Sequence, residues 1–241
     1  LVRANRALDD VCRAYQLPCI SGKDSMKNDA MLGGEKISVP PTLLFSLLGN
    51  HHDVRKAVSS DFKRPGDAIF LVGQTHQELG ASEISFMLRD EGVGGIGGAV
   101  PEIDPGRNMS AYRALTVAMR DELVASAHDC SDGGLAVALA ECCFGSDSGA
   151  AVDITPLWSD CDNLDLWGAL FGESLGRILV SISSDDRGAF EASMGGVCCH
   201  YIGDVSEGDE ILVTRNGEAV LTASMSEMRD SWKGTLHGGG A

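Results

Sequence analysis

The sequence predicts an α+β fold in which helices pack on a sheet. Two patterns support this class. Segments with a helical spacing of apolar residues alternate with apolar runs of strand length, and several of those runs follow one another with no helix between them. The 241 residues, 44% of them hydrophobic, are enough for one large core or two modest ones.

The first quarter of the chain is expected to hold one helix and two strands around a polar loop. An amphipathic helix is expected over residues 1–17, and Pro18 would end it. A short buried strand is expected at residues 17–21, and a second apolar strand at residues 42–50, "TLLFSLLGN". Between the two strands lie the polar loop "SGKDSMKND" and the glycine pair Gly33-Gly34.

The rest of the chain begins with a Pro65-Gly66 turn and is expected to form a second domain. Strands are expected at residues 68–72, 126–131, 177–183, 198–205 and 210–216, and helices at residues 107–125, 135–144 and 224–234. The predicted domains are therefore residues 1–63, a partial sheet domain, and residues 64–235, an α+β domain, followed by a tail at residues 236–241.

Composition excludes several classes of partner. The chain carries 35 acidic and 19 basic residues, a formal net charge of −16, and no basic run that could neutralise a nucleic-acid backbone. Its apolar runs are shorter than a membrane span. The eight cysteines are spaced neither as a disulfide framework nor as the paired motifs of a zinc site, so we expect reduced cysteines in a cytoplasmic protein.

The polar loop contains the first candidate site, Gly22-Lys23-Asp24-Ser25. Glycine permits close approach of the backbone to a ligand, Asp24 offers the hard oxygen that Mg²⁺ prefers, and Lys23 and Ser25 can donate to a phosphate. The spacing is not that of a Walker loop. A solvated polar turn is the alternative.

The second candidate is the strand-to-helix turn in "AHDCSDGGLAVALAE". Two glycines there would expose helix N-terminal amides to an anion, while Asp129 could hold a metal and Ser131 could donate to phosphate. The alternative is that Ser131 or Asp132 only caps the helix, which we favour for Asp132. We interpret His128 as structural.

A third set, Glu173, Ser174 and Arg177, precedes a buried strand, and Arg177 is expected to pair with Glu173. The run "GVGGIG" at residues 92–97 matches a dinucleotide fingerprint in letters only. No helical pattern follows it, so we interpret it as a glycine loop.

Taken together, four motifs in this order resemble one family. "SGKDSMKND", "LGASE" (residues 79–83), "AHDCSDGGLAVALAE" and "LFGESLGRILVSI" are similar to the C-terminal half of the synthetase part of phosphoribosylformylglycinamidine synthases. The resemblance covers essentially the whole chain and implies a fold like that of aminoimidazole ribonucleotide synthetase. "GKDSM" and "HDCSDGGL" resemble the large single-chain type, and "FGESLGR" the small multi-subunit type.

The resemblance implies an ATP- and Mg²⁺-dependent C–N ligase of purine biosynthesis, which converts formylglycinamide ribonucleotide to its amidine with ammonia from glutamine. It implies that Gly22 and Lys23 contact nucleotide, Ser25 the substrate and Asp24 a metal, Lys23 standing where the small type has asparagine. It implies further that Asp129 binds Mg²⁺ and Ser131 a nucleotide in a second cleft. Glu173 and Ser174 would correspond to a substrate loop of the other half, which leaves their role here open.

The implied partners are an N-terminal half of the same enzyme and a glutaminase domain or subunit, with a homodimer of the chain also open. Because the family's catalytic histidine lies in that other half and the sequence starts at Leu1 within a helical pattern, we expect a fragment that folds but is inactive alone. Two alternatives stay open. One is another ATP-using enzyme of the same superfamily, and the other is a non-catalytic half that holds a structural nucleotide.

Overall fold

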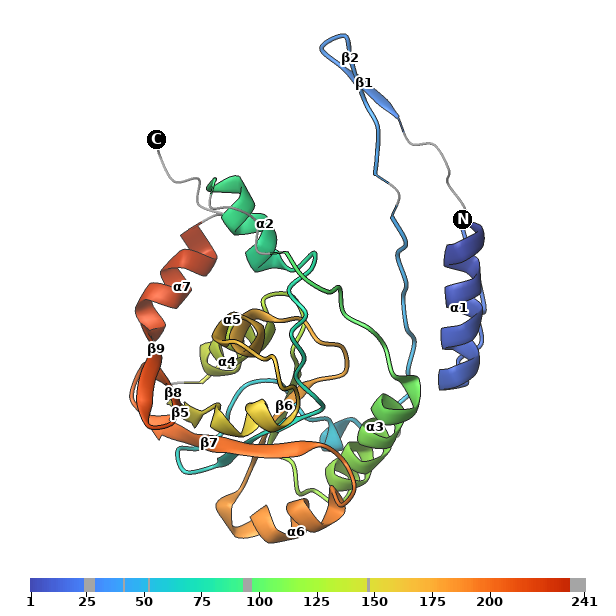
Figure 1. The fold of residues 1–241 in the computed structure, drawn as a ribbon. Helices are drawn as coiled ribbons and strands as arrows, with labels where there is room; N and C mark the ends of the chain where they lie inside the picture. Colours follow the sequence, from blue (N-terminus) through green and yellow to red (C-terminus); the bar gives the residue numbers. More distant parts are fainter. Residues whose placement is uncertain (24–28, 41, 52, 93–96, 147, 235–241) are drawn as a thin grey trace. The chain divides into compact units, whose positions relative to one another are not determined.

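The computed structural model describes residues 1–23, 29–40, 42–51, 53–92, 97–146 and 148–234 (Figure 1). The chain divides into two compact units, Leu1–Arg55 and Lys56–Ala241. The domain boundary that the Pro65-Gly66 turn predicts, between residues 63 and 64, stays a prediction. Each unit is described by itself.

The first unit consists of a helix, a hairpin and extended chain. Helix α1 spans Val2–Tyr15, as predicted, and ends where Gln16 adopts a left-handed conformation. Strands β1 (Ala30–Leu32) and β2 (Glu35–Ile37) pair antiparallel around Gly33 and Gly34. Both glycines have positive φ, 61° and 85°, which suits a two-residue turn of type I′. A short 3₁₀ turn, η1 (Val54–Lys56), follows at the end of the unit.

The two strands predicted at residues 17–21 and 42–50 are wrong. The described residues of both segments have no regular structure, and Leu44, Leu47 and Leu48 are 89%, 82% and 92% exposed. An apolar run becomes a strand only where neighbouring strands pair its backbone and cover its side chains. The described residues of this unit supply no such neighbour.

The second unit is built on a seven-stranded sheet with the order β4-β6-β3-β7-β5-β8-β9. Its strands are β3 (Ala68–Val72), β4 (Ser126–Asp129), β5 (Ser148–Asp153), β6 (Ile178–Ile182), β7 (Cys199–Glu207), β8 (Glu210–Arg215) and β9 (Glu218–Ser224). Every neighbouring pair is antiparallel except β5 and β8. This mixed sheet confirms the predicted α+β class.

Helices cover both faces of this sheet (Figure 1). The helical elements are α2 (Glu83–Asp90), α3 (Pro105–Arg120), α4 (Gly134–Phe144), η2 (Thr155–Ser159), α5 (Leu166–Phe171), η3 (Ser184–Asp186), α6 (Arg187–Ser193) and α7 (Met225–Gly234). One core contains residues of α4, α5 and α7, and the other contains residues of α3 and α6.

Strand β3 shows how one sequence segment serves both cores. Its side chains alternate between faces, as in any strand. Ile69 and Leu71 join the core under α4, whereas Phe70 and Val72 join the core under α3 and α6. All five residues are buried, which explains why the segment reads as a continuous apolar run.

Strand β5, which the sequence analysis did not predict, is made of small residues. A Cβ atom at Gly149 would lie 2.1 Å from the carbonyl oxygen of Glu210, so only glycine allows the parallel neighbour β8 to approach. Helix α2, helices α5 and α6, and strand β9 were also missed. Within the described residues, no helix combines the length and apolar character needed to cross a bilayer.

A buried carboxylate before β3 gives a testable pH dependence. Asp67 is 6% exposed, and its Oδ2 atom has no hydrogen-bond partner among the described residues. Burial raises the pKa of Asp67 above its ordinary value of 3.8, and the nearby Arg64 only partly opposes this shift. When the pKa of a carboxyl group is higher in the folded state than in the unfolded state, the protein loses stability as the pH rises from the unfolded-state pKa through the folded-state pKa.

We therefore predict that Asp67→Asn raises the melting temperature at pH 7 by a few degrees, since about 1 kcal/mol corresponds to ~2–4 °C for a domain of this size. The gain should shrink as the pH falls through the carboxyl pKa. Asp61→Asn is the matched control and should lower the melting temperature at pH 7, because hydrogen bonds from Lys63 and Ser59 lower the pKa of Asp61. Thermal melts of both variants between pH 3 and pH 7 check this, and a pH-independent gain for Asp67→Asn would contradict it.

Candidate functional site

Three of the motifs identified in the sequence meet at the carboxylate of Glu173. Its Oε1 atom accepts hydrogen bonds of 2.9 Å from the backbone N–H of Glu83 and of 2.9 Å from that of Gly133. Glu83 ends "LGASE" and begins helix α2, while Gly133 belongs to "SDGGL" and precedes helix α4. One side chain therefore joins segments that lie 90 and 40 residues away from it in the sequence.

The electrostatics of this junction are favourable. The first amides of a helix carry a partial positive charge and lack partners within the helix. Glu173 places a negative charge at the start of two helices and accepts one such amide from each. Its role is thus structural at this point, as a distant cap for α2 and α4.

The predicted cap of α4 by Asp132 is wrong. Gly133 is the capping residue, with a φ of 80°, and no side chain near it in sequence accepts its amide. A local side-chain cap needs an extended backbone at the cap position, and the left-handed conformations of Gly133 and Gly134 prevent it. The amide of Gly133, which the sequence analysis offered to an anion, donates to Glu173 instead.

Gly134 allows the two loops to touch. A Cβ atom at this position would lie 2.5 Å from the carbonyl oxygen of Gly172 and 2.9 Å from that of Leu170. Its φ of 65° also favours glycine. The close backbone contact between "SDGGL" and "LFGES" thus depends on the absence of a side chain.

Ser174 fixes the neighbouring loop at residues 73–76. The side chain is buried, and its Oγ atom accepts the N–H of His76 at 3.0 Å and approaches the His76 carbonyl at 3.4 Å. These bonds satisfy the hydroxyl within the protein. The structure therefore gives Ser174 a positioning role in this loop.

Arg177 is the largest fully buried side chain of the unit and does not pair with Glu173, contrary to our expectation. Its guanidinium donates to the Thr75 hydroxyl at 3.3 Å and to the Gly172 carbonyl. Among the described residues, no carboxylate lies within ion-pair distance of it, and its Nε atom has no partner. Burial lowers the pKa of Arg177, an effect that the charges of Glu78, Asp160 and Glu173 oppose from a distance.

Asp129 and Ser131, both predicted as ligands, lie together on the turn between β4 and α4. The Ser131 hydroxyl donates to Oδ2 of Asp129, and both residues are exposed. A carboxylate and a hydroxyl are hard oxygen ligands of the kind that Mg²⁺ takes. The donor set of this turn therefore fits a magnesium ion beside a phosphate.

His128 is held by carboxylates on both sides. Its Nε2 atom lies 2.7 Å from Oε2 of Glu141, and its Nδ1 atom lies 3.6 Å from Oδ1 of Asp129. The ring is 20% exposed. This arrangement agrees with the structural interpretation of His128, since both ring nitrogens face groups of the protein itself.

The first candidate loop belongs to the other unit. Gly22 and Lys23 are exposed, and a Cβ atom at Gly22 would meet no atom within 4 Å. Asp24 and Ser25 lie outside the described residues, as do residues 93–96 of the glycine loop. The ligand roles given to this loop stay predictions.

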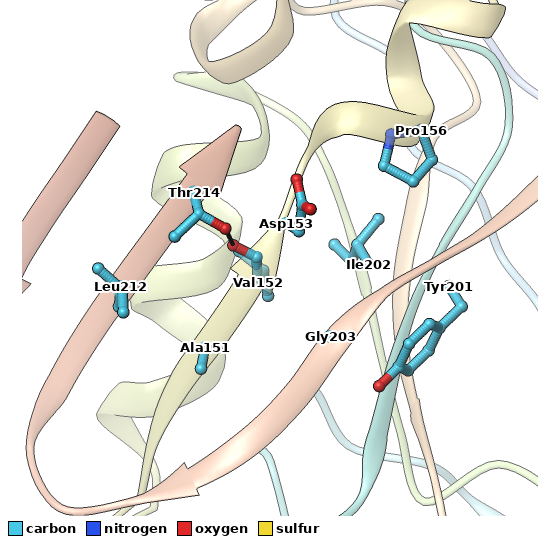
Figure 2. Close-up of a pocket in the computed structure, with 9 residues that line it drawn as sticks. All are labelled: Ala151, Val152, Asp153, Pro156, Tyr201, Ile202, Gly203, Leu212 and Thr214. Carbon is cyan, nitrogen blue, oxygen red and sulfur yellow. Dashed lines mark hydrogen bonds between the residues drawn. The ribbon is translucent and has the colours of Figure 1, made fainter. Parts of the chain in front are cut away.

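A separate cavity of about 380 Å³ lies against strands β5, β7 and β8 (Figure 2). Its polar groups already have partners: Asp153 accepts the Thr155 amide at 2.9 Å, and the Thr214 hydroxyl donates to the Val152 carbonyl at 3.3 Å. None of the described candidate residues lines this cavity. It is therefore not part of the candidate site.

The role of Glu173 could not be found from sequence spacing. Nothing in "LFGES" identifies its glutamate as the acceptor for amides 40 and 90 residues away. Helix α2 has a local cap, because the Ser82 hydroxyl accepts the Ser85 amide. The local signal was therefore confined to the start of α4, where Gly133 has no side chain to act as a cap. That signal indicates a missing acceptor without identifying it.

Comparisons with known proteins agree with this architecture. The family model described as AIR synthase related protein, C-terminal domain, matches residues 64–216, which is more than half of the chain. Three solved structures of Thermotoga maritima proteins are similar at low sequence identity, which shows a common fold.

PurL complexed with FGAR has a TM-score of 0.60 at 19% identity, over 72% of this chain and 29% of its own. PurL complexed with ATP has a TM-score of 0.56 at 21% identity, over 71% and 27%. Phosphoribosylformylglycinamidine synthase II has a TM-score of 0.54 at 19% identity, over 70% and 27%. The chain thus matches little more than a quarter of the length of these proteins.

We predict that Glu173→Ala lowers the free energy of unfolding by roughly 1.5–3 kcal/mol, because two helix-start amides lose a charged acceptor. Glu173→Gln should lose less, since one oxygen acceptor remains. Glu91→Ala, which removes an exposed carboxylate at the end of α2, should stay within about 0.5 kcal/mol of the parent. Urea unfolding followed by circular dichroism measures all three, and a Glu173→Ala variant as stable as Glu91→Ala would refute the bridging role.

Proposed function

Because the chain belongs to the family of AIR synthase related proteins, whose C-terminal domain it carries at residues 64–216, we propose that it is part of a phosphoribosylformylglycinamidine synthase. This enzyme is an ATP- and Mg²⁺-dependent C–N ligase of the cytoplasm. It converts formylglycinamide ribonucleotide to the amidine with ammonia derived from glutamine, in purine biosynthesis.

The observation that carries this proposal is the junction at Glu173. The motifs "LGASE", "SDGGL" and "LFGES", on which the family resemblance was based, are not scattered over the surface but meet within hydrogen-bond distance. The similar structures of PurL include complexes with ATP and with FGAR, two of the substrates that the proposed reaction needs besides ammonia.

In this proposal Asp129 holds Mg²⁺ and Ser131 contacts a phosphate of the nucleotide. When bound, the ion neutralises phosphate charge. Glu173 keeps the turn between β4 and α4 in place through the Gly133 amide. Gly22 and Lys23 are proposed to contact nucleotide, Asp24 a metal and Ser25 the substrate, with the loop serving the complete enzyme.

The chain is proposed to need the other half of the synthetase and a source of ammonia, a glutaminase domain or subunit. Two observations support this dependence. The matched structures are more than three times the length of the segment that they share with this chain, and the apolar residues Leu44, Leu47 and Leu48 are exposed. We expect no turnover by the chain alone; turnover with ATP, ammonia and formylglycinamide ribonucleotide would overturn this dependence.

One observation favours a second candidate function, a half that holds a structural nucleotide and does no chemistry. His128, in β4 next to the candidate turn, already faces Glu141 and Asp129. A group engaged in this way is poorly placed to move a proton to or from a substrate. In this alternative, Asp129 and Ser131 keep the roles given above, but the nucleotide stays bound.

We predict that Asp129→Asn and Ser131→Ala in the complete enzyme weaken binding of Mg²⁺-nucleotide at this turn, since each loses one ligand atom. Under saturating nucleotide the melting temperature should fall by several degrees, because ligand at 100 times its Kd stabilises by about 2.7 kcal/mol. Asp132→Asn, an exposed neighbour with no assigned role, is the control and should melt like the parent.

Equal nucleotide-dependent stabilisation of all four proteins would contradict the assignment of the turn. The two candidate functions are separated by analysing the nucleotide released on denaturation. A retained nucleotide that is not exchanged during turnover supports the structural role, and an exchanging one supports the catalytic role.

A further inference from the structure

A second cluster of ligand-type side chains lies apart from the turn at Asp129. Asp160, Cys198 and His200 each offer one ligand atom, and these three atoms lie within 4.8 Å of one another. It is the one group of three such residues within the part of the chain that the structure describes. We propose that these three residues form a binding site for Zn²⁺.

The distances within the cluster are close to those of a zinc coordination sphere. The Sγ atom of Cys198 lies 3.5 Å from Nε2 of His200 and 3.4 Å from Oδ1 of Asp160. Zn–S bonds of about 2.3 Å and Zn–N or Zn–O bonds of about 2.0 Å at tetrahedral angles place such ligand atoms roughly 3.3–3.6 Å apart. When an ion enters, the 2.7 Å hydrogen bond between His200 and Asp160 has to lengthen, and the Cys198 thiol gives up its 3.6 Å hydrogen bond to the Gly73 carbonyl.

The geometry does not suit a nucleophilic relay. In a Cys-His-Asp relay, the thiol and the carboxylate contact different nitrogens of the imidazole ring, so that a proton passes through it. Here Cys198 and Asp160 both face Nε2 of His200. Convergence on one atom leaves no path for a proton through the ring, whereas one ion can contact all three ligand atoms.

The protein holds the three ligands in place. Cys198 directly precedes β7 and His200 is its second residue, so the two lie two residues apart on extended chain and project to the same face. Asp160 follows η2, and its other oxygen, Oδ2, accepts the Thr75 amide at 2.9 Å. The side chains of Asp160 and His200 are 4% and 17% exposed, so little reorganisation of water opposes binding.

Charge also favours a divalent ion. A thiolate, a carboxylate and a neutral imidazole carry two negative charges, which Zn²⁺ neutralises. Three protein ligands leave the fourth position to water or another small ligand. The Thr75 amide donates a hydrogen bond to Asp160, and the Thr75 hydroxyl accepts one from Arg177. A bound ion would thus stiffen the loop at residues 73–76, to which Ser174 is also attached.

The test uses the full chain, freed of metal with a chelator and then titrated with Co²⁺ and with Zn²⁺. We expect one ion per chain, a thiolate-to-cobalt charge-transfer band and a rise in melting temperature with Zn²⁺. Cys198→Ser should abolish the band and weaken Zn²⁺ binding by at least about 100-fold, since loss of an outer-shell partner alone costs 10–100-fold. Asp160→Asn should weaken binding as well.

Two controls address the other cysteines. Cys199→Ser changes the adjacent thiol, which packs against the core under α3 and α6, and should keep the band. Cys12→Ser tests the pair Cys12 and Cys19, whose sulfur atoms lie 3.6 Å apart, and should also keep it.

Unchanged Zn²⁺ affinity in Cys198→Ser, or no bound ion in the parent chain, would overturn the proposal. If Cys198→Ser does not fold, zinc X-ray absorption of the parent decides, with one sulfur and two or three nitrogen or oxygen neighbours expected. More than one sulfur, or none, would contradict the proposal.

Discussion

The carboxylate of Glu173 is the interaction on which the arrangement of the second unit depends most. Accepting the first amides of two helices, it fixes where α2 and α4 begin. The exposed turn with Asp129 and Ser131 lies directly before α4, so its position follows from that bond. A distant carboxylate at two helix starts is more constraining than two local caps, because it ties the helices to each other and to the loop before β6.

Next to this junction, several buried polar groups hold the loop backbones in position and have no assigned role in catalysis. Arg177 holds the Gly172 carbonyl and the Thr75 hydroxyl, and Ser174 holds His76. Removing one partner from such a network leaves a buried group unsatisfied, which costs more than the bond itself contributes. The exposed, ligand-type residues thus lie on loops whose backbones are held by buried hydrogen bonds. This arrangement is expected where the ligand atoms must keep their positions and the ligand must still be able to enter.

The sequence predicted the elements that carry strong local patterns. Strand β3, a run of five buried apolar residues, and helix α4, which starts at the second of two glycines, were both found. Strand β5 was missed because Gly149 and its small neighbours are dictated by the approach of β8, a tertiary contact with no local signal. The prediction of a strand around Leu44 was wrong for the opposite reason, because an apolar run forms a strand only where neighbouring strands pair with it. At the candidate site, Asp129 and Ser131 were predicted by type and spacing, whereas Glu173 and the Asp160 cluster depend on contacts between distant segments.

In the proposed function, the turn between β4 and α4 carries magnesium-bound nucleotide in a complete synthetase. The most direct measurement is the crystal structure of the complete protein with Mn²⁺ and a non-hydrolysable ATP analogue, with anomalous scattering used to locate the ion. The account predicts an anomalous peak within coordinating distance of the Asp129 carboxylate, with a nucleotide phosphate beside Ser131 and the Glu173 bonds intact. A bound Mn²⁺-nucleotide elsewhere, with Asp129 and Ser131 facing only solvent, would contradict it.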